Sequence, residues 1–368
     1  MRRKTRAKSK RRIAFVTGSR AEFGLMRRTL AAIQAHPILH LQIIATGMHL
    51  DWTLGNTIAG IGKIDATVPW DGESRAVATG SAIAGLAKTF RKLKTDVVLT
   101  VGDRVEAFAA ATAAHLLDIP VAHIHGGDRA QGQADDSLRH AITKLAHIHF
   151  PATSKSDARI RRMGEDKWRI HRVGSPGIEN IHDDAAQTPG LQQRKYALLV
   201  LHPVDADEQI EFRRARMILS ATKSVANRII IIYPNNDPGS RGIIRCWEKF
   251  AVGDQFIVHK NISREMFLGL LRDASVLIGN SSSGIIEAAS FGTPVVDIGP
   301  RQFGRERAAD VLHVEYDERQ IRRALFSATQ SRHRAHNPYA GKKTASQIAD
   351  ILAKVFIDNR LLRKVIAY

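Results

Sequence analysis

The sequence predicts an α/β protein of two domains, each a parallel β-sheet covered by helices on both faces. Short apolar runs alternate with longer helical stretches along nearly the whole chain, which is the pattern of parallel sheets. The alternation pauses once, at residues 183–190, where turn-forming residues are concentrated, and then resumes. The length of 368 residues also suits two domains better than one.

The first domain is expected to span residues 13–186. Helical spacing is clearest where Ala82, Leu86, Phe90 and Leu93 fall on one face. The predicted strands are Arg12–Thr17, Leu41–Thr46, Asp96–Val101, Pro120–Ile124, Ile148–Pro151 and Trp168–Val173. The predicted helices are Ala21–Ala35, Glu73–Leu93, an Ala-rich helix after Glu106, and Ser154–Met163.

The second domain is expected to span residues 187–342, with a cleft between the two halves. Its predicted strands are Tyr196–Leu201, Arg228–Tyr233, Gln255–Val258, Ser275–Ile278 and Pro294–Asp297. Its predicted helices are Asp207–Ala226, Arg264–Arg272 and Gly284–Ser290. Within the last segment, 343–368, one long helix from Lys343 to Arg363 is expected to cross back onto the first half.

Composition places the chain among globular proteins of a reducing compartment. Hydrophobic residues make up 44% and charged residues 25%, which is enough for a packed core. No apolar run approaches the ~18 residues needed to span a bilayer, and no signal peptide is evident. The single cysteine, Cys246, excludes an internal disulfide framework. We therefore expect a cytoplasmic protein without a membrane partner.

The net charge of +19 is uneven, because residues 1–12 hold eight Lys or Arg and no acid, leaving +11 (19 − 8) elsewhere. This basic tail is predicted to be disordered. The remaining excess suits nucleic acid, a membrane surface or a phosphorylated ligand. Aromatic residues are only 6%, and no nucleic-acid-binding motif is visible. A basic nucleic-acid-binding protein is thus a rival interpretation, and we expect no nucleic-acid partner.

Acidic and imidazole side chains gather in the stretch from Gly102 to Lys144. Two acidic turns each follow a strand-like apolar run, and ligands collect at the carboxyl ends of parallel strands. Carboxylates and imidazoles placed there can transfer protons on a bound substrate. The alternative is ordinary turn chemistry, for which Asp and Gly are good residues. The candidates are Asp103, His125, Asp128, Asp135 and Asp136.

The sharpest motif of the second half runs from Gly279 to Glu287, between an apolar strand and a helix. Its backbone N–H groups and hydroxyls face outward at a helix N-terminus, a geometry that favours binding of phosphate oxygens. Glu287 lies where a carboxylate can accept hydrogen bonds from ribose hydroxyls. The alternative is an ordinary Ser N-cap, and the motif is not a Walker A loop. The candidates are Asn280, Ser281, Ser282, Ser283, Gly284 and Glu287.

Several isolated residues are weaker candidates. Arg20 follows the first strand, and His202 follows the strand Tyr196–Leu201; a solvated arginine and a structural histidine are the respective alternatives. Arg301 and Arg305 could reach a pyrophosphate or form surface ion pairs instead. A metal site is a further hypothesis for His123, His125, His147 and His149 with Asp103, but their spacing matches no zinc pattern. No Gly-x-Ser-x-Gly elbow occurs either. We expect neither metal nor cofactor.

Taken together, five segments resemble the hydrolysing UDP-N-acetylglucosamine 2-epimerases, in their order along the chain from about Arg12 to Val314. They are Gly102–Arg104, His123–Gly127, Asp135–Lys144, Asn280–Gly284 and Gly299–Arg305. The resemblance implies two Rossmann-like domains in a GT-B-like pair, with UDP-sugar in the cleft and no metal or nicotinamide. It also implies loss of the sugar's C2 proton as UDP leaves C1, a 2-acetamidoglucal intermediate, and addition of water to release N-acetylmannosamine.

The resemblance also suggests roles for individual residues. The family's first catalytic acid falls on Asp103, and a second position, Glu in several sialic-acid enzymes, falls on His125. The branch that also carries His there usually has Glu where this chain has Asp128. A later acidic pair maps to Asp135 and Asp136. Nucleotide-binding positions fall on Arg20, His202, Ser281–Gly284 and Glu287, and we add Arg104, Asn280, Arg301 and Arg305 as substrate-binding candidates.

The resemblance leaves the substrate open between members of one class. The first expectation is UDP-N-acetylglucosamine, feeding synthesis of sialic acid. The alternatives are the 2,4-diacetamido-2,4,6-trideoxy sugar of the legionaminic acid branch, and a non-hydrolysing 2-epimerase that leaves the sugar on UDP. A GT-B glycosyltransferase is a further rival, and a homo-oligomer is expected.

Overall fold

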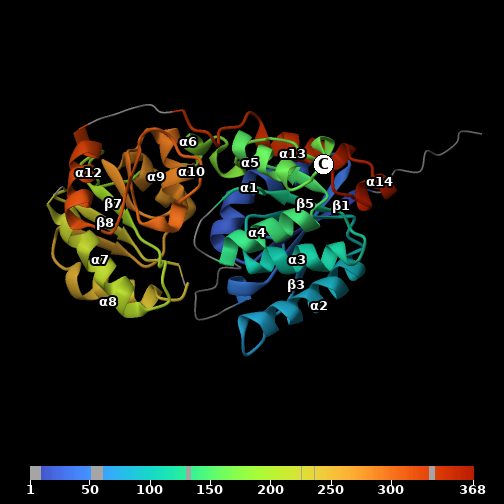
Figure 1. Cartoon of the computed structure of the whole chain (residues 1–368), viewed down its shortest axis with the longest axis horizontal. Helices are drawn as coiled ribbons and strands as arrows, with labels where there is room; N and C mark the ends of the chain where they lie inside the picture. Colours follow the sequence, from blue (N-terminus) through green and yellow to red (C-terminus); the bar gives the residue numbers. More distant parts are fainter. Residues whose placement is uncertain (1–9, 51–60, 130–133, 225, 236, 331–335) are drawn as a thin grey trace, which may run out of the picture. The chain divides into compact units, whose positions relative to one another are not determined.

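The computed structural model describes residues 10–50, 61–129, 134–224, 226–235, 237–330 and 336–368. The chain divides into two compact units (Figure 1). Unit 1 comprises Met1–Asp128, Ala134–Glu179 and Ala340–Tyr368, and unit 2 comprises Arg129–Gln133 and Asn180–Tyr339. The C-terminal segment therefore belongs to the same unit as the N-terminal strands.

Unit 1 is built on a six-stranded sheet in the order β3-β2-β1-β4-β5-β6, with every neighbouring pair parallel. The strands are β1 (Arg11–Thr17), β2 (Leu39–Ala45), β3 (Ala66–Thr67), β4 (Val97–Val101), β5 (Val121–Ile124) and β6 (Ile148–Phe150). All residues of β4 and β5 are buried. Such continuous burial is expected when helices cover both faces of a parallel sheet.

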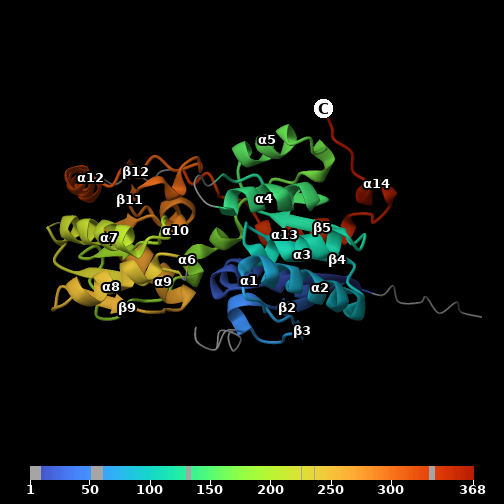
Figure 2. The ribbon, with the colours of Figure 1, turned by 60° about the horizontal axis from the view of Figure 1, so that its bottom comes forward.

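Two helix layers cover this sheet. One apolar core joins Phe15 of the sheet to Met26 of α1 and to Ile348 and Leu352 of α13, which lies among the elements of unit 1 in Figure 2. A second core on the other face contains residues of α2 and α3. The helices of unit 1 are α1 (Arg20–Ala35), α2 (Arg75–Leu93), α3 (Val105–His115), α4 (Ala134–Leu145), α5 (Ser154–Arg162), α13 (Thr344–Lys354) and α14 (Asn359–Leu362).

Unit 2 repeats the plan with a parallel sheet in the order β12-β11-β10-β7-β8-β9. Its strands are β7 (Ala197–Val200), β8 (Ile229–Ile232), β9 (Phe256–His259), β10 (Val276–Gly279), β11 (Val295–Ile298) and β12 (Val311–Val314). Its helices are α6 (Ile181–Asp184), α7 (Glu208–Lys223), α8 (Ser240–Phe250), α9 (Arg264–Asp273), α10 (Ser282–Ile286), α11 (Ala288–Phe291) and α12 (Glu318–Gln330). The predicted class, two Rossmann-like α/β domains with parallel sheets, is confirmed.

Some individual elements differ from the prediction. The strand expected at Trp168–Val173 is instead a 3₁₀ turn, η4 (Lys167–Arg169), followed by one isolated bridge from Ile170 to His149. The helix expected at Gly284–Ser290 is two short helices, α10 and α11, that meet at Glu287. The single long terminal helix is likewise two, α13 and α14, because extended backbone at Val355 ends the first.

The predicted limits also shift. Arg11 and Arg12, assigned to the basic tail 1–12, are strand residues of β1, and residues 1–9 lie outside the described part. Arg12 is held there by an ion pair with Asp96, 2.9 Å between Nη2 and Oδ1. The long segment of unit 2 begins at Asn180, whereas the sequence placed a boundary after residue 186. Across the described residues, no helix has the length and apolarity required to cross a membrane.

Candidate active site

The ends of β4 and β5 bring the first two candidate residues together. The two strands are neighbours, with Val101 opposite Ile124, so the turns that follow them lie at the same sheet edge. Gly102 has φ +74° and His125 has φ +60°, so both chains turn sharply at their first residue beyond the strand. Asp103 and His125 thus lie at the carboxyl edge of the sheet, as the sequence predicts.

Arg139, on α4, links these two turns. Its guanidinium forms an ion pair with Asp103, and its Nη1 donates to the carbonyl oxygen of His125 at 3.1 Å. The side chain of Arg139 is only 3% exposed, whereas that of Asp103 is 23% exposed. Sequence reasoning did not single out Arg139, although it lies one helical turn after Asp135 and Asp136.

His125 and Asp128 form a buried pair. Nδ1 of His125 lies 2.9 Å from Asp128 Oδ2, with side chains only 6% and 2% exposed. The other imidazole nitrogen lies 3.0 Å from Ser175 Oγ, and Ser156 Oγ donates to Asp128 Oδ1 at 2.7 Å. Both serines were missed, because neither belongs to a motif and Ser175 is 50 positions from His125.

The remaining first-half candidates are partly described. Asp136 lies on α4 with 28% of its side chain exposed, and its Oδ2 is 3.5 Å from His140 Nε2. Asp135 lies in the first turn of α4 and Arg20 begins α1, but their side chains are outside the described part of the chain.

Arg104 belongs to a second polar group that the sequence did not reveal. It binds Glu106 through two contacts, 3.0 and 3.2 Å, and Glu106 is buried. Glu22 lies nearby and accepts the Gly18 N–H at 2.8 Å. Burial raises the pKa of Glu22 to about 7, and the negative charge of Glu106 adds to the effect. A Cβ on Gly18 would lie 2.7 Å from the Glu106 carboxyl carbon, so only glycine leaves room there.

In unit 2, Asn280 joins the ends of β7 and β10. Its amide oxygen accepts the His202 N–H at 2.7 Å, and its amide nitrogen donates to the His202 carbonyl at 2.8 Å. Nδ1 of His202 accepts the Asn235 N–H at 3.1 Å, so the ring proton lies on Nε2. Burial lowers the pKa of His202 to about 3, and nearby Arg301 lowers it further. His202 is therefore a neutral hydrogen-bond donor near pH 7.

The Ser-rich turn follows directly. Ser281 caps α10, with its Oγ accepting the Ser283 N–H at 3.3 Å, and Ser282 and Ser283 are half-buried. Gly284 is buried, and a Cβ there would lie 2.9 Å from Val295. Glu287 is held by Arg264 at 2.6 Å. Arg264 was not predicted, since it lies outside the motif and 23 positions before Glu287.

The segment after β11 contacts the same turn. Nη1 of Arg301 donates to the Asn280 carbonyl at 3.3 Å, and Nε2 of Gln302 donates to the same oxygen at 2.9 Å. Arg305 is half-buried, and its backbone N–H bonds to the Gln302 carbonyl at 3.3 Å. Asn280, His202, Arg301 and the serines are thus brought together around one turn, as an anion-binding site requires.

Among the residues that the structure describes, no group of three or more His, Cys, Asp or Glu side chains could hold a metal ion. His123, His147 and His149 are buried, and each pairs with other groups of the fold.

Comparison with known proteins identifies a family. Residues 31–353 match the family model described as UDP-N-acetylglucosamine 2-epimerase. A UDP-N,N'-diacetylbacillosamine 2-epimerase (hydrolyzing) of Legionella pneumophila is 36% identical, covering 97% of this chain and 100% of its own length. A UDP-N-acetylglucosamine 2-epimerase of Neisseria meningitidis is 34% identical, covering 86% of this chain and 87% of its own.

Solved structures show the same fold. The Neisseria meningitidis UDP-GlcNAc 2-epimerase bound to UDP-GlcNAc superimposes with a TM-score of 0.79 at 20% identity, covering 94% of this chain and 100% of that one. The Staphylococcus aureus MnaA–UDP complex gives a TM-score of 0.79 at 18% identity, covering 93% and 96%. With a family model matched over most of its length, the chain belongs to the UDP-N-acetylglucosamine 2-epimerase family.

Proposed function

We propose that the protein is a hydrolysing UDP-N-acetylglucosamine 2-epimerase, which converts UDP-N-acetylglucosamine and water into UDP and free N-acetylmannosamine. The observation that carries the proposal is the pairing of the partly exposed Asp103 with the buried Arg139 at a sheet edge. This pair supplies a carboxylate that is held in one position. The other unit contributes a neutral histidine and a serine-rich turn, which are suited to binding an anion. Support for the hydrolysing type comes from the name of the Legionella relative.

The proton-transfer chemistry falls to unit 1. The proton on C2, the carbon that bears the acetamido group, is not acidic, so a base must act while the C1–O bond to UDP breaks. We assign that base to Asp103, because its carboxylate is 23% exposed whereas His125 is 6% exposed. The electrons of the C2–H bond form the C1=C2 double bond, and those of the C1–O bond leave with UDP.

The second half of the reaction adds water across this double bond. The hydroxyl group of water joins C1. A proton joins C2 on the face opposite to the one from which the first proton was removed, which gives the manno configuration. We assign the acid of this step to the Asp135–Asp136 pair at the start of α4; Asp136 is 28% exposed. His125 and Asp128 then orient the turn, because both ring nitrogens of His125 lie within hydrogen-bond distance of protein groups.

UDP is held by unit 2 in this proposal. The Ser281–Ser283 turn and the Nε2–H of His202 donate to phosphate oxygens, and Arg301 and Arg305 supply positive charge. Glu287, kept in place by Arg264, accepts from the ribose hydroxyls. A neutral His202 suits this role because it donates one directed hydrogen bond at any pH near neutrality.

A second candidate substrate is UDP-2,4-diacetamido-2,4,6-trideoxyglucose. It is favoured by two relatives named for UDP-N,N'-diacetylbacillosamine, at 36% and 31% identity. The test is a panel of UDP-sugars, assayed for UDP release and for the configuration of the freed sugar. UDP with a free manno-configured sugar is expected. Epimerised sugar still attached to UDP, or transfer to an acceptor, would replace the proposal with the corresponding rival.

A further inference from the structure

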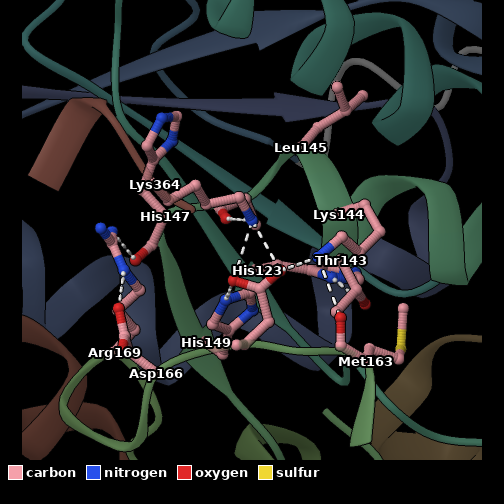
Figure 3. Close-up of polar contacts among 12 residues, drawn as sticks. His123, Thr143, Lys144, Leu145, His147, His149, Met163, Asp166, Arg169 and Lys364 are labelled. Atoms are coloured by element: carbon pink, nitrogen blue, oxygen red, sulfur yellow. Dashed lines mark hydrogen bonds and ion pairs between the residues drawn. The ribbon is translucent and has the colours of Figure 1, made fainter. Parts of the chain in front are cut away.

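His123, on β5, is a fully buried histidine that the proposed reaction does not use. Its Nε2 lies 2.8 Å from the carbonyl oxygen of Gly102, and its Nδ1 lies 3.2 Å from Oγ1 of Thr143. Figure 3 shows His123 and Thr143 close together in a polar cluster of unit 1. The ring thus contacts two segments that are distant in sequence, the turn after β4 and the helix α4.

The ring is neutral and its tautomer is fixed. A carbonyl oxygen can only accept, so the Gly102 contact requires the proton on Nε2. Burial lowers the pKa of His123 to about 3. Nδ1 is consequently an acceptor near pH 7, and His123 has no proton to give a substrate without breaking the Gly102 contact. Both ring nitrogens are therefore used in hydrogen bonds within the fold.

Both contacts lead to Asp103. Gly102 is the residue directly before Asp103 and holds the left-handed φ of +74° that starts the turn. Thr143 lies one helical turn after Arg139 on α4, and its single hydroxyl proton is donated to Nδ1 of His123. Arg139 in turn pairs with the Asp103 carboxylate. His123 therefore touches the backbone that carries the carboxylate and the helix that carries its partner.

The turn that carries His125 is fitted around the same ring. A Cβ on Gly126 would lie 2.8 Å from Nδ1 of His123 and 3.1 Å from Oγ1 of Thr143. No side chain at position 126 is accommodated unless this pair moves. Three parts of the candidate site, the Asp103 turn, the His125 turn and α4, thus meet at one imidazole.

We propose that His123 is a positioning residue, which sets the Asp103 carboxylate by holding the Gly102 carbonyl and, through Thr143, the helix that carries Arg139. The inference rests on the proposed function, because it assumes that Asp103 acts in the chemical step. In this proposal His123 does not touch the sugar, but it determines where the catalytic base, Asp103, lies. A displacement of about 1 Å at a reacting group costs on the order of 10²-fold in rate.

The test compares two amides at position 123. In His123→Gln the amide nitrogen reaches as far as Nε2 and can still donate to Gly102, whereas in His123→Asn it reaches only as far as Nδ1. We expect kcat to fall roughly 10–100-fold in His123→Asn, with much of it recovered in His123→Gln. The dissociation constant for UDP, measured by calorimetry, is expected to stay unchanged in both, and Tm is recorded for each.

Thr143→Val provides a milder variant if position 123 does not tolerate substitution. It removes one hydroxyl with little change of shape, and it is expected to lower kcat several-fold without altering UDP affinity. The matched control is Thr29→Val on α1, a buried threonine whose Oγ1 has no hydrogen-bond partner among the described residues.

Equal losses of kcat in both amides, in proportion to their loss of Tm, would overturn the proposal and make His123 an ordinary core residue. Unchanged kcat in Thr143→Val would overturn the link to α4. Failure of the proposed function is distinguishable, because the unmodified protein would then release no UDP from any sugar of the panel.

Discussion

Asp103 and Asp136 keep about a quarter of their side chains exposed, at 23% and 28%, whereas Asp128 is enclosed at 2%. A carboxylate that takes a proton from a bound sugar must reach the substrate, but one that orients a neighbour need not. We therefore place chemistry on Asp103 and the α4 acids, and orientation on the His125–Asp128 pair.

Asp103→Asn keeps the size of the side chain but removes the proton acceptor. We expect kcat to fall by roughly 10²–10⁴-fold, the usual contribution of general acid–base catalysis. UDP affinity is expected to be nearly unchanged, because the UDP-binding candidates other than Arg20 and Arg104 lie in unit 2. Steady-state kinetics beside calorimetry with UDP checks both.

Asp96→Asn is the matched control for this variant, since Asp96 also pairs with an arginine of unit 1, at 2.9 Å, but precedes β4 at the opposite end of the strand. It is expected to leave kcat unchanged. If Asp103→Asn loses UDP binding and retains turnover at saturation, Asp103 is a ligand-positioning residue instead.

Glu22 gives a pH-dependent prediction. Burial raises its pKa to about 7 from 4.5, so the folded state keeps a proton that the unfolded state has lost. Its stabilising contribution is complete below pH 4.5 and is lost as pH rises through 7. Glu22→Gln cannot ionise, so it should gain about 2–3 kcal/mol relative to the unmodified protein between pH 4.5 and 8. Urea unfolding at both pH values measures this gain, and an equal difference at both would contradict it.

At the scale of elements, the backbone conformation of the turn between β10 and α10 determines where its polar side chains lie. Gly279 has φ +126°, and a Cβ there would lie 2.0 Å from the Val200 carbonyl oxygen. The close approach brings the ends of β7 and β10 together, which lets Asn280 bind both backbone groups of His202. The serines of the turn are thereby placed beside a neutral imidazole.

Combined Ser282→Ala and Glu287→Ala should weaken UDP binding by a few kcal/mol, since each hydrogen bond to a charged group contributes ~1.5–3 kcal/mol. Calorimetry with UDP measures the loss. The matched control is Ser220→Ala with Glu318→Ala, a Ser–Glu contact of 3.0 Å in unit 2 whose glutamate is also bound to an arginine. Equal losses in the two double variants would exclude a specific role for the turn.

The C-terminal segment forms another element-level unit with η4 and α4. Lys364 contacts both oxygens of Glu165, at 2.8 and 2.9 Å, and Lys144 of α4 shares one of them at 2.7 Å. Figure 3 shows Lys364, Lys144 and His149 gathered in this cluster. Arg169 donates to the Leu361 carbonyl at 2.8 Å, so the segment after α13 is fastened twice. Arg169 is the last residue of η4, the turn found where the sequence predicts a strand.

Glu165→Gln should lower the free energy of unfolding by about 3 kcal/mol, because removing one partner of a buried ion pair leaves the others uncompensated. The hydrogen bonds of His149 and the two lysines hold the pKa of Glu165 down at about 2, so its carboxylate is ionised at pH 6, where the loss is to be measured. Asp157→Asn, which breaks the exposed 2.6 Å pair with Arg161, is the control and should cost little. Urea unfolding distinguishes the two.

At the scale of the whole molecule, buried histidines determine how stability responds to acid. Burial lowers the pKa values of His123, His147 and His202 to about 3, from 6.5. Below pH 6.5 these histidines bind protons in the unfolded chain but not in the folded chain. The contribution of the three histidines to the free energy of unfolding is therefore lost as pH falls through 6.5 towards 3. Glu22, whose pKa is raised, works in the opposite direction.

Each of these histidines should remove about 1.4 kcal/mol of stability per pH unit below 6.5. We therefore expect Tm to fall steeply between pH 6.5 and 4.5, before most carboxylates titrate. Calorimetry across this range measures the slope, and a Tm that is flat down to pH 4.5 would contradict it. His202→Asn should reduce the slope for the unfolding of unit 2.

The sequence by itself determined the fold class and the sheet edges at which chemistry is expected. A parallel sheet covered on both faces requires continuous apolar strands, so β4 and β10 can be predicted from their residues alone. Ligand groups gather at the carboxyl ends of such strands, which is why Asp103 and the Ser281–Ser283 turn could be chosen before any coordinates. Their catalytic and binding roles stay predictions until the variants are measured.

Only the tertiary structure decided which partners these residues have. Ser175 meets His125 across 50 positions, and Lys364 meets Glu165 across 199. A local pattern reports which face of a strand or helix is buried, but a hydrogen bond between distant segments depends on how those segments pack. For the same reason the sequence did not reveal that Arg139, on α4, contacts Asp103. It also did not reveal that the terminal helix is divided in two, with the second part bound by Arg169.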